Sequence, residues 1–331
     1  MEEKKTRKWR WGVNRWIILA LIILGFWWSG VYPPITPTIQ LPAEALSATP
    51  IIDSPVLGKV YLTNTMVAMV LVDILLVLLI LAVQKATKSG DLVPKGITGA
   101  LEAVIEFMYN LTESTAGKKW GRKIFPYFAA ITITVLIVNW MELIPGVDSI
   151  GLIHHSEEGN PVQEIAAGSG IFALVKGELA QGQQGYEIVP FVRAVSTDLN
   201  FTFALALISV IMTQVMGVRA HGIDYFSKFW NTKTIFSRPF FGLLDWAVGL
   251  LELISEISKI LSFAFRLFGN IFAGSVMLFV IGSLVPVVAQ SIFLGLEFFV
   301  GAIQAVVFGM LTMTFMAQAT SGHGGHAEAG H

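Results

Sequence analysis

The chain has 331 residues, of which 54% are hydrophobic and only 14% are charged. Ordinary soluble domains contain about 45–50% apolar and about 25% charged residues, so this composition predicts an all-α integral membrane protein. The formal net charge of −1 gives no basic field for binding nucleic acid. The absence of cysteine excludes disulfides and sites built on thiolates. Any chemistry must therefore use other groups.

The N-terminus places a basic segment directly before an apolar run, IILALIILGFWW, at residues 17–28. The positive-inside bias puts the basic flank on the cytoplasmic side. A cleaved signal peptide also places a basic segment before an apolar one. It needs small residues at the cleavage site that follows, however, and this part of the chain contains Trp27 and Tyr32. This favours a retained anchor helix. The many prolines of residues 32–60 predict an extended external segment.

Apolar runs farther along the chain predict helices that cross the membrane or lie on it. Residues 62–83 supply the ~20 residues that a spanning helix requires. In residues 97–117 apolar positions recur every three or four residues, as in an amphipathic helix on the membrane surface. Residues 125–144 then cross outward, and residues 199–217 return inward. We therefore expect about four spanning or peripheral helices after the anchor.

Two long apolar stretches follow a polar external insert (146–197) and a basic cytoplasmic connection (218–239). Both stretches, residues 240–285 and 287–319, exceed the ~25 residues of even a long perpendicular span. We expect two long, strongly tilted helices packed as a hairpin. The predicted organisation is an N-terminal region at 1–60, a membrane domain at 61–319 and a flexible His/Gly tail at 320–331.

Arg266 is the most informative single residue, because it lies in the apolar sequence LSFAFRLFGN. Four polar residues fall within about 40° of it around a helix of 100° per residue: Glu252, Lys259, Ser262 and Asn270. The last helix repeats a polar residue every seven positions, at Gln290, Glu297 and Gln304. Two polar stripes can thus face one another. Ionisable residues inside a membrane are expensive and usually mark a conduction path or a pair.

Structural interpretations of these residues stay open. Lys259 and Glu252 can be a snorkelling cation and a satisfied surface carboxylate. Glu297 can neutralise Arg266 as an ion pair between helices. Asp73 lies well inside its span, where it either lines an ion path or faces a neighbouring helix. Arg266 is too far from the helix ends for easy snorkelling, which favours a functional role.

The segments around these stripes resemble a known family. LLELISEISKILSFAFRLFGNIFAGSVM and EFFVGAIQAVVFGMLTMTFMA, together with NWMELIPG and STDLNFTFALAL, closely resemble the membrane-embedded a subunit of F-type ATP synthases. The likeness covers about residues 60–319. It implies a stator subunit that translocates ions and is not an enzyme by itself. No GxxxxGK[ST] fingerprint occurs, so ATP chemistry is expected on partner subunits.

The resemblance also implies a mechanism and partners. An arginine at the position of Arg266 faces a carboxylate on each passing c subunit, and two offset half-channels reach that carboxylate from opposite sides of the membrane. A guanidinium favours the ionised carboxylate without relaying the proton, so it separates the channels. The implied partners are the c-subunit ring, a b-type peripheral stalk, the bilayer of a prokaryotic plasma membrane and transported H⁺, with Na⁺ still open. No cofactor, metal or nucleic acid is expected.

Further site residues are carried over from the family. Asn270 matches the asparagine of the RLFGN motif, and Gln304 matches the glutamine of the last helix. Glu297 occupies a site that is histidine in some members, while Ser275 lies where those members have glutamate. The acid has changed helices, which makes Glu297 the candidate proton acceptor of the outer half-channel. The outer half-channel is expected to include Asp198 and Asn200, and the inner one Glu252, Glu256 and Ser262.

A stand-alone secondary transporter or ion channel is the alternative function. Many such transporters contain inverted repeats and paired broken helices, and neither is evident in this sequence. The two functions differ in one observable property. A stator subunit co-purifies with a multi-subunit ATPase, whereas an independent transporter moves its substrate after reconstitution alone.

Overall fold

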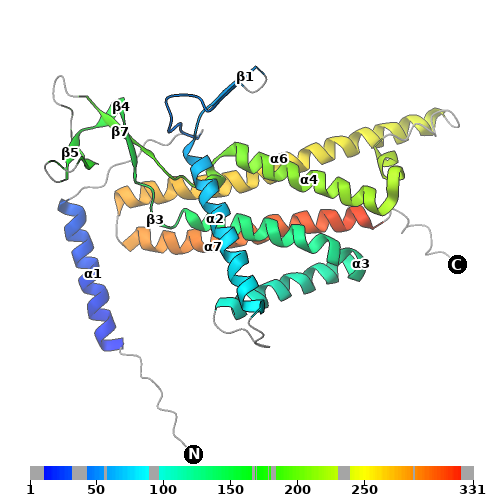
Figure 1. Cartoon of the computed structure of the whole chain (residues 1–331), viewed down its shortest axis with the longest axis horizontal. Coiled ribbons are helices and arrows are strands. Elements are labelled where there is room, and N and C mark those ends of the chain that lie inside the picture. The colour runs from blue at the N-terminus through cyan, green and yellow to red at the C-terminus, as the bar shows by residue number, and fades with distance from the viewer. Residues whose placement is uncertain are drawn as a thin grey trace, which may run out of the picture.

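The chain is mostly helical in the computed structural model (Figure 1). The structure describes residues 11–31, 43–55, 58–88, 97–165, 168, 170–177, 179, 184–229, 239–285 and 288–321. The α-helices are α1 (Trp11–Val31), α2 (Asn64–Lys88), α3 (Ile97–Met141), α4 (Leu199–His221), α6 (Pro239–Leu284) and α7 (Val288–Thr320). Within the described residues, five helices are long and apolar enough to cross a membrane, and a shorter apolar helix precedes them. The predicted fold class is confirmed.

The two C-terminal helices are longer than the membrane is thick. Helix α6 has 46 residues and α7 has 33, which correspond to lengths of about 69 and about 50 Å at 1.5 Å per residue. The hydrocarbon core measures only about 30 Å, so helices of this length fit within it only if they are strongly inclined. Figure 1 shows α6, α7 and α4 running in a similar direction, while α2 runs across it. Helices α6 and α7 pack together as the predicted hairpin.

Helix α3 joins two segments that were predicted separately. The expected surface helix at 97–117 and the expected span at 125–144 are merged, with a break at Gly117 (φ 72°, ψ 165°). Glycine adopts this left-handed φ without a steric penalty. The basic residues after the break are helical, and the ammonium of Lys123 lies 4.5 Å from the centroid of the Trp120 ring. The helix therefore continues through the basic cluster and begins before residue 125.

Small residues bring α7 close to α3. Gly301, Ala305 and Gly309 recur every four residues and so share one face of α7. A Cβ atom on Gly301 would lie 3.2 Å from the Cβ of Asn139, and one on Gly309 would overlap the side chain of Thr132. Ala305 is fully buried. Close backbone contact of this kind is the usual basis of helix association in lipid, where van der Waals packing replaces the hydrophobic effect.

The core that supports Arg266 lies between four helices. Phe263 and Leu267 of α6 are buried against α3, α4 and α7, and the rings of Phe263 and Phe308 are 5.1 Å apart. Successive residues of a helix differ by 100° in direction. Burial of Leu267 therefore turns neighbouring Arg266 toward the open side of α6.

Short strands form the part outside the helices, and they were not predicted. They pair as three two-stranded antiparallel sheets, β1 with β2, β4 with β7 and β5 with β6, whereas β3 precedes β4 in the chain. Two 3₁₀ helices flank α4: η1 (Val195–Thr197) and η2 (Gly222–Lys228). The strands are β1 (Ile52–Ser54), β2 (Gly58–Val60), β3 (Pro145–Asp148), β4 (Gly151–Asn160), β5 (Val162–Glu164), β6 (Phe172–Leu174) and β7 (Tyr186–Pro190).

Several predictions concern residues outside the described ranges. They include the basic residues 1–10, residues 32–42 of the proline-rich segment and most of the tail at 320–331. Part of the cytoplasmic connection, residues 230–238, also lies outside them. The described portion of the proline-rich segment contains the β1–β2 pair rather than a simple extended chain.

Candidate functional site

Arg266 lies on a face of α6 that the rest of the described chain leaves open. Its guanidinium Nη2 donates to Ser262 Oγ at 3.2 Å, and both residues are exposed, as is Asn270. The ion pairs within the described residues join Lys228 or Lys259 to glutamates and do not include Arg266. The alternative in which Glu297 neutralises Arg266 is therefore not seen there. The cation is available to a group from outside the chain.

The two polar stripes meet one turn beyond Arg266. Asn270 Nδ2 on α6 donates to Gln304 Oε1 on α7 at 2.7 Å. Gln304 is 4% exposed, and its Nε2 has no hydrogen-bond partner within the described part of the chain. A buried amide N–H₂ group strongly favours an acceptor. This amide is thus free to donate to water or to a group on a partner.

Two glutamates converge on the same part of α6, farther along the helix from Arg266. Glu297 of α7 is 6% exposed, and its Oε1 lies where a Cβ on Gly274 would have to be. The neighbouring Ser275 donates its Oγ proton to Glu142, which follows the last residue of α3. Glu142 belongs to the NWMELIPG segment, but the sequence alone predicted no role for it. An acid near the end of the predicted span at 125–144 was the available signal.

The end of α3 is held against α7 beside these glutamates. Asn139 is 3% exposed, donates through Nδ2 to the carbonyl of Gly301 at 3.1 Å and accepts from Ser196 Oγ at 2.7 Å. Trp140 stacks on Phe298 with centroids 4.6 Å apart and donates to the Phe298 carbonyl at 3.1 Å. These contacts keep Glu142 and Glu297 in one cluster.

Asp198 makes the contacts of a helix cap. It precedes α4, and its Oδ1 accepts from the backbone N–H of Asn200 at 2.9 Å, an arrangement that satisfies a free donor of the first turn. Its Oδ2 accepts from Thr65 Oγ1 of α2 at 3.0 Å. Asp198 is 9% exposed, whereas Asn200 is exposed. The carboxylate therefore ties α2 to the start of α4.

A cluster of charges lies at the other end of the Arg266 stripe. Glu256, 7% exposed, accepts from Lys228 of η2 at 3.3 Å and from Lys259 at 3.0 Å. Glu252 forms a weaker pair with Lys228 at 3.7 Å. Ser262 follows Lys259 by about one turn and contacts Arg266. The acids predicted for the inner half-channel are thus paired with lysines, and Lys259 is an ion-pair partner.

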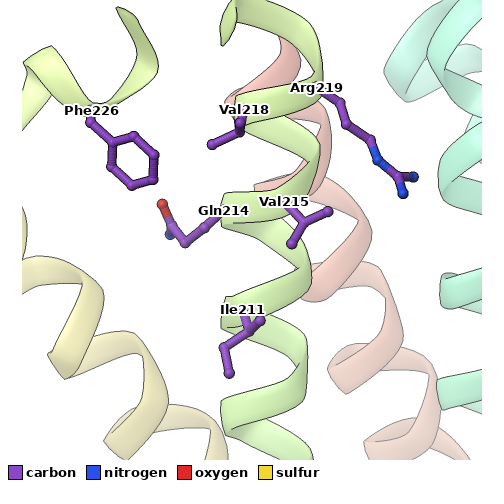
Figure 2. A pocket seen from close by; sticks show the side chains of 6 residues that line it. All are labelled: Ile211, Gln214, Val215, Val218, Arg219 and Phe226. Atoms are coloured by element: carbon purple, nitrogen blue, oxygen red, sulfur yellow. The ribbon is translucent and has the colours of Figure 1, made fainter. Parts of the chain in front are cut away.

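The lysine cluster continues toward α4 through neutral groups. Lys228 Nζ donates to the Tyr225 hydroxyl at 2.8 Å, and that hydroxyl donates to Gln214 Oε1 at 3.0 Å. Gln214 also lines an apolar cavity of about 440 Å³. Figure 2 shows Gln214 and Phe226 on one side of α4 and the Arg219 guanidinium on the other. The residues lining this cavity are Ile211, Gln214, Val215, Val218, Arg219 and Phe226, so none of the predicted site residues lies there.

Together these features define a multi-pass helical membrane protein with an intramembrane arginine between two groups of acids. The family model described as "ATP synthase A chain" matches residues 65–317. The chain belongs to this family and is a non-catalytic, proton-translocating membrane subunit of ATP synthase. A relative, ATP synthase subunit a of Moorella thermoacetica, is 25% identical over 250 residues, which cover 76% of this chain and 88% of the relative. Membership of the family favours the stator subunit over the stand-alone transporter.

Proposed function

We propose that Arg266 separates two proton half-channels that open to opposite sides of the membrane and meet at a rotor carboxylate. The observation that supports this most is the open position of Arg266, without a carboxylate partner among the described residues. A permanent cation facing lipid is expensive, and such residues normally pair. In the assembled complex, an acid of another subunit supplies the missing negative charge.

The outer half-channel ends at the carboxyl groups of Glu142 and Glu297. Ser275 connects the two acids. Its hydroxyl donates to Glu142, and the residue before it, Gly274, is the one against which Glu297 packs. Carboxyl groups accept and release protons, and a hydroxyl both donates and accepts. A proton entering from outside is held by this cluster and then passed to the rotor acid. Asp198 and Asn200 border the entrance from the start of α4.

The hydrogen-bonded amides of Asn270 and Gln304 lie where the rotor carboxylate passes Arg266. These side chains do not ionise, so they hold water or a carboxylate without becoming proton carriers. The Nε2 of buried Gln304, which has no hydrogen-bond partner among the described residues, supports this role. A rotor carboxylate that has given up its proton is attracted to Arg266 and accepts hydrogen bonds as it passes.

The inner half-channel follows the stripe from Ser262 toward Glu252 and Glu256. Lys228 and Lys259 pair with these acids, so charged side chains gather at this end of the stripe. Ionised groups retain water, and water provides the continuous path by which a proton leaves. Arg266 blocks direct passage between this path and the outer cluster, because its guanidinium does not release a proton.

The assembly that this mechanism requires contains a ring of c subunits facing α6 and a b-type stalk that prevents rotation of the stator. Its location is the plasma membrane of a prokaryote, a proposal supported by the bacterial relative. Pumping measured in sodium-free buffer tests the coupling ion. Pumping that requires added sodium would contradict proton coupling.

Replacement of Arg266 tests the proposed function. In inverted membrane vesicles, Arg266→Ala should abolish ATP-driven acidification while the complex still assembles. Arg266→Lys should also be impaired, because a buried ammonium can lose its proton and a guanidinium cannot. Arg219→Ala is the matched control, since Arg219 lies in the last turn of α4 and outside the proposed path. Normal pumping by assembled Arg266→Ala would contradict the proposal.

A further inference from the structure

Helix α2 carries an acidic residue that the described chain does not cover. Asp73 lies about 13 Å along the helix axis from Asn64, where α2 begins. This places the carboxyl group near the middle of a hydrocarbon core of about 30 Å. Its side chain is exposed, and no ion pair within the described residues includes it. It therefore lacks a partner in this part of the chain.

Asp73 belongs to one exposed stripe of α2. The face that packs against α3 and η1 is marked by Ala68 and Val72, both fully buried. At 100° per residue, Asp73 lies to one side of this face. Four exposed residues lie within about 40° of Asp73 around the axis: Met66, Val77, Ile80 and Gln84. This Asp73 stripe therefore contains a second polar side chain, Gln84, toward the other end of the helix.

Lipid, α1 and a second copy of the chain are all poor occupants of this stripe. Acyl chains offer no donor to a carboxyl group, and intramembrane acids almost always face a polar partner or a water-filled cavity. The middle of α1, residues 17–26, contains only apolar residues and glycine, so it offers no side-chain donor at the level of a mid-helix acid. A second copy presenting the same stripe would set Asp73 against Asp73. The suitable occupant is a helix from a different chain.

We propose that the Asp73 stripe is the interface with a membrane-spanning helix of another subunit, one that carries a basic or hydrogen-bond-donating side chain at the depth of Asp73. The apolar residues Met66, Val77 and Ile80 supply the packing surface, and Asp73 fixes the depth and orientation of the partner helix. The arginine face of α6 is not involved, because α2 packs on α3 and η1. This inference rests on membership of the complex and is independent of the half-channel proposal.

Site-directed crosslinking tests the interface, because the chain contains no cysteine of its own. Val77→Cys places a thiol on the stripe, about 40° from Asp73, and Leu78→Cys places one about 140° away. The two positions are matched, since Val77 is 54% and Leu78 is 57% exposed. Each variant is labelled with a photoactivatable maleimide in membranes that contain the assembled complex, and the adducts are identified by mass spectrometry.

We expect Val77→Cys to form an adduct with a membrane helix of another subunit, and Leu78→Cys to form adducts with lipid alone. The Val77→Cys adduct should persist with Asp73→Asn, which keeps a hydrogen-bonding side chain, and be lost with Asp73→Leu. Several results would overturn the proposal: lipid adducts alone at Val77, an adduct with α1 or a second copy, the same partner at both positions, or an unchanged adduct with Asp73→Leu. The Val77 and Leu78 comparison leaves Asp73 intact, so it holds even if Asp73→Leu fails to fold.

Discussion

The carboxyl group of Glu297 on α7 packs directly against the backbone of Gly274 on α6, in the space that any larger residue would fill. This contact sets how close the two helices of the hairpin come at the acidic cluster. It also places Glu297 beside Ser275, which bonds to Glu142. The absence of a side chain at Gly274 is therefore a requirement for the position of the acid.

Substituting alanine for Gly274 should displace the Glu297 carboxyl group. We expect ATP-driven proton pumping to fall roughly tenfold or more with Gly274→Ala, because small displacements of reacting groups have large effects on rate. The amount of assembled complex should be unchanged. Gly295→Ala is the control, since a Cβ on Gly295 meets no atom of the described residues within 4 Å. Equal pumping rates for the two variants would contradict the position assigned to Glu297.

The bond between Ser275 and Glu142 should couple the effects of their substitutions. Ser275→Ala removes the donor, and Glu142→Gln removes the ionisable acid. Residues in direct contact show non-additive effects in double-mutant cycles. We expect Ser275→Ala to lower the pumping rate in the parent but to add little to Glu142→Gln. Strictly multiplicative losses would show that the two residues act independently.

Removal of Glu256 should lower the stability of the protein more than removal of Lys228. Glu256→Leu leaves Lys228 and Lys259 without their common partner, whereas Lys228→Met leaves the pair between Glu256 and Lys259 in place. Breaking a buried ion pair typically costs about 3–5 kcal/mol. The melting temperature in detergent should therefore fall further for Glu256→Leu. The opposite order would mean that the cluster depends on Lys228 more than on Glu256.

The stability of the segment around Asp148 should decrease as the pH rises. Burial raises the pKa of Asp148 to about 6 from 3.8, although neighbouring Arg193 acts in the lowering direction. The folded state thus binds the proton of Asp148 more tightly than the unfolded state does. The contribution of Asp148 to stability is therefore fully present below the unfolded pKa of 3.8 and is lost as the pH rises to about 6. The loss amounts to at most about 3 kcal/mol.

Asp148→Asn should remove this pH dependence. Asparagine also tolerates the positive φ of 60° at this position. Amide hydrogen exchange of β3 and β4, corrected for the intrinsic effect of pH, should show protection that decreases from pH 4 to pH 7 in the parent and stays constant in the variant. A parallel decrease in both proteins would assign the effect to another group.

Continuous apolar segments made the helices predictable, because a run of about 20 apolar residues is typical of a membrane-spanning helix. The polar stripe of α6 followed from helical periodicity alone, since Arg266, Ser262 and Asn270 recur at helical spacing. Both predictions depend on local sequence. The positions of the other site residues depend on contacts between distant segments, which a single sequence does not reveal.

The missed features share this origin. Glu142 follows an apolar run, a position typical of the end of a membrane span. It nevertheless accepts a hydrogen bond from Ser275, 133 residues later. Asp198 was predicted near the outer path, but its contacts with Asn200 and Thr65 depend on where α4 begins. The strand pairs of the insert at 146–197 have short, irregular patterns. Pairing between segments rather than periodicity determines them.

The most direct test of the account is the distance between the Arg266 guanidinium and the nearest acidic side chain of another subunit in a structure of the assembled ATP synthase. We predict contact, either as an ion pair within hydrogen-bonding distance or through one ordered water. A guanidinium directed into lipid or bulk water, remote from every rotor carboxylate, would contradict the account.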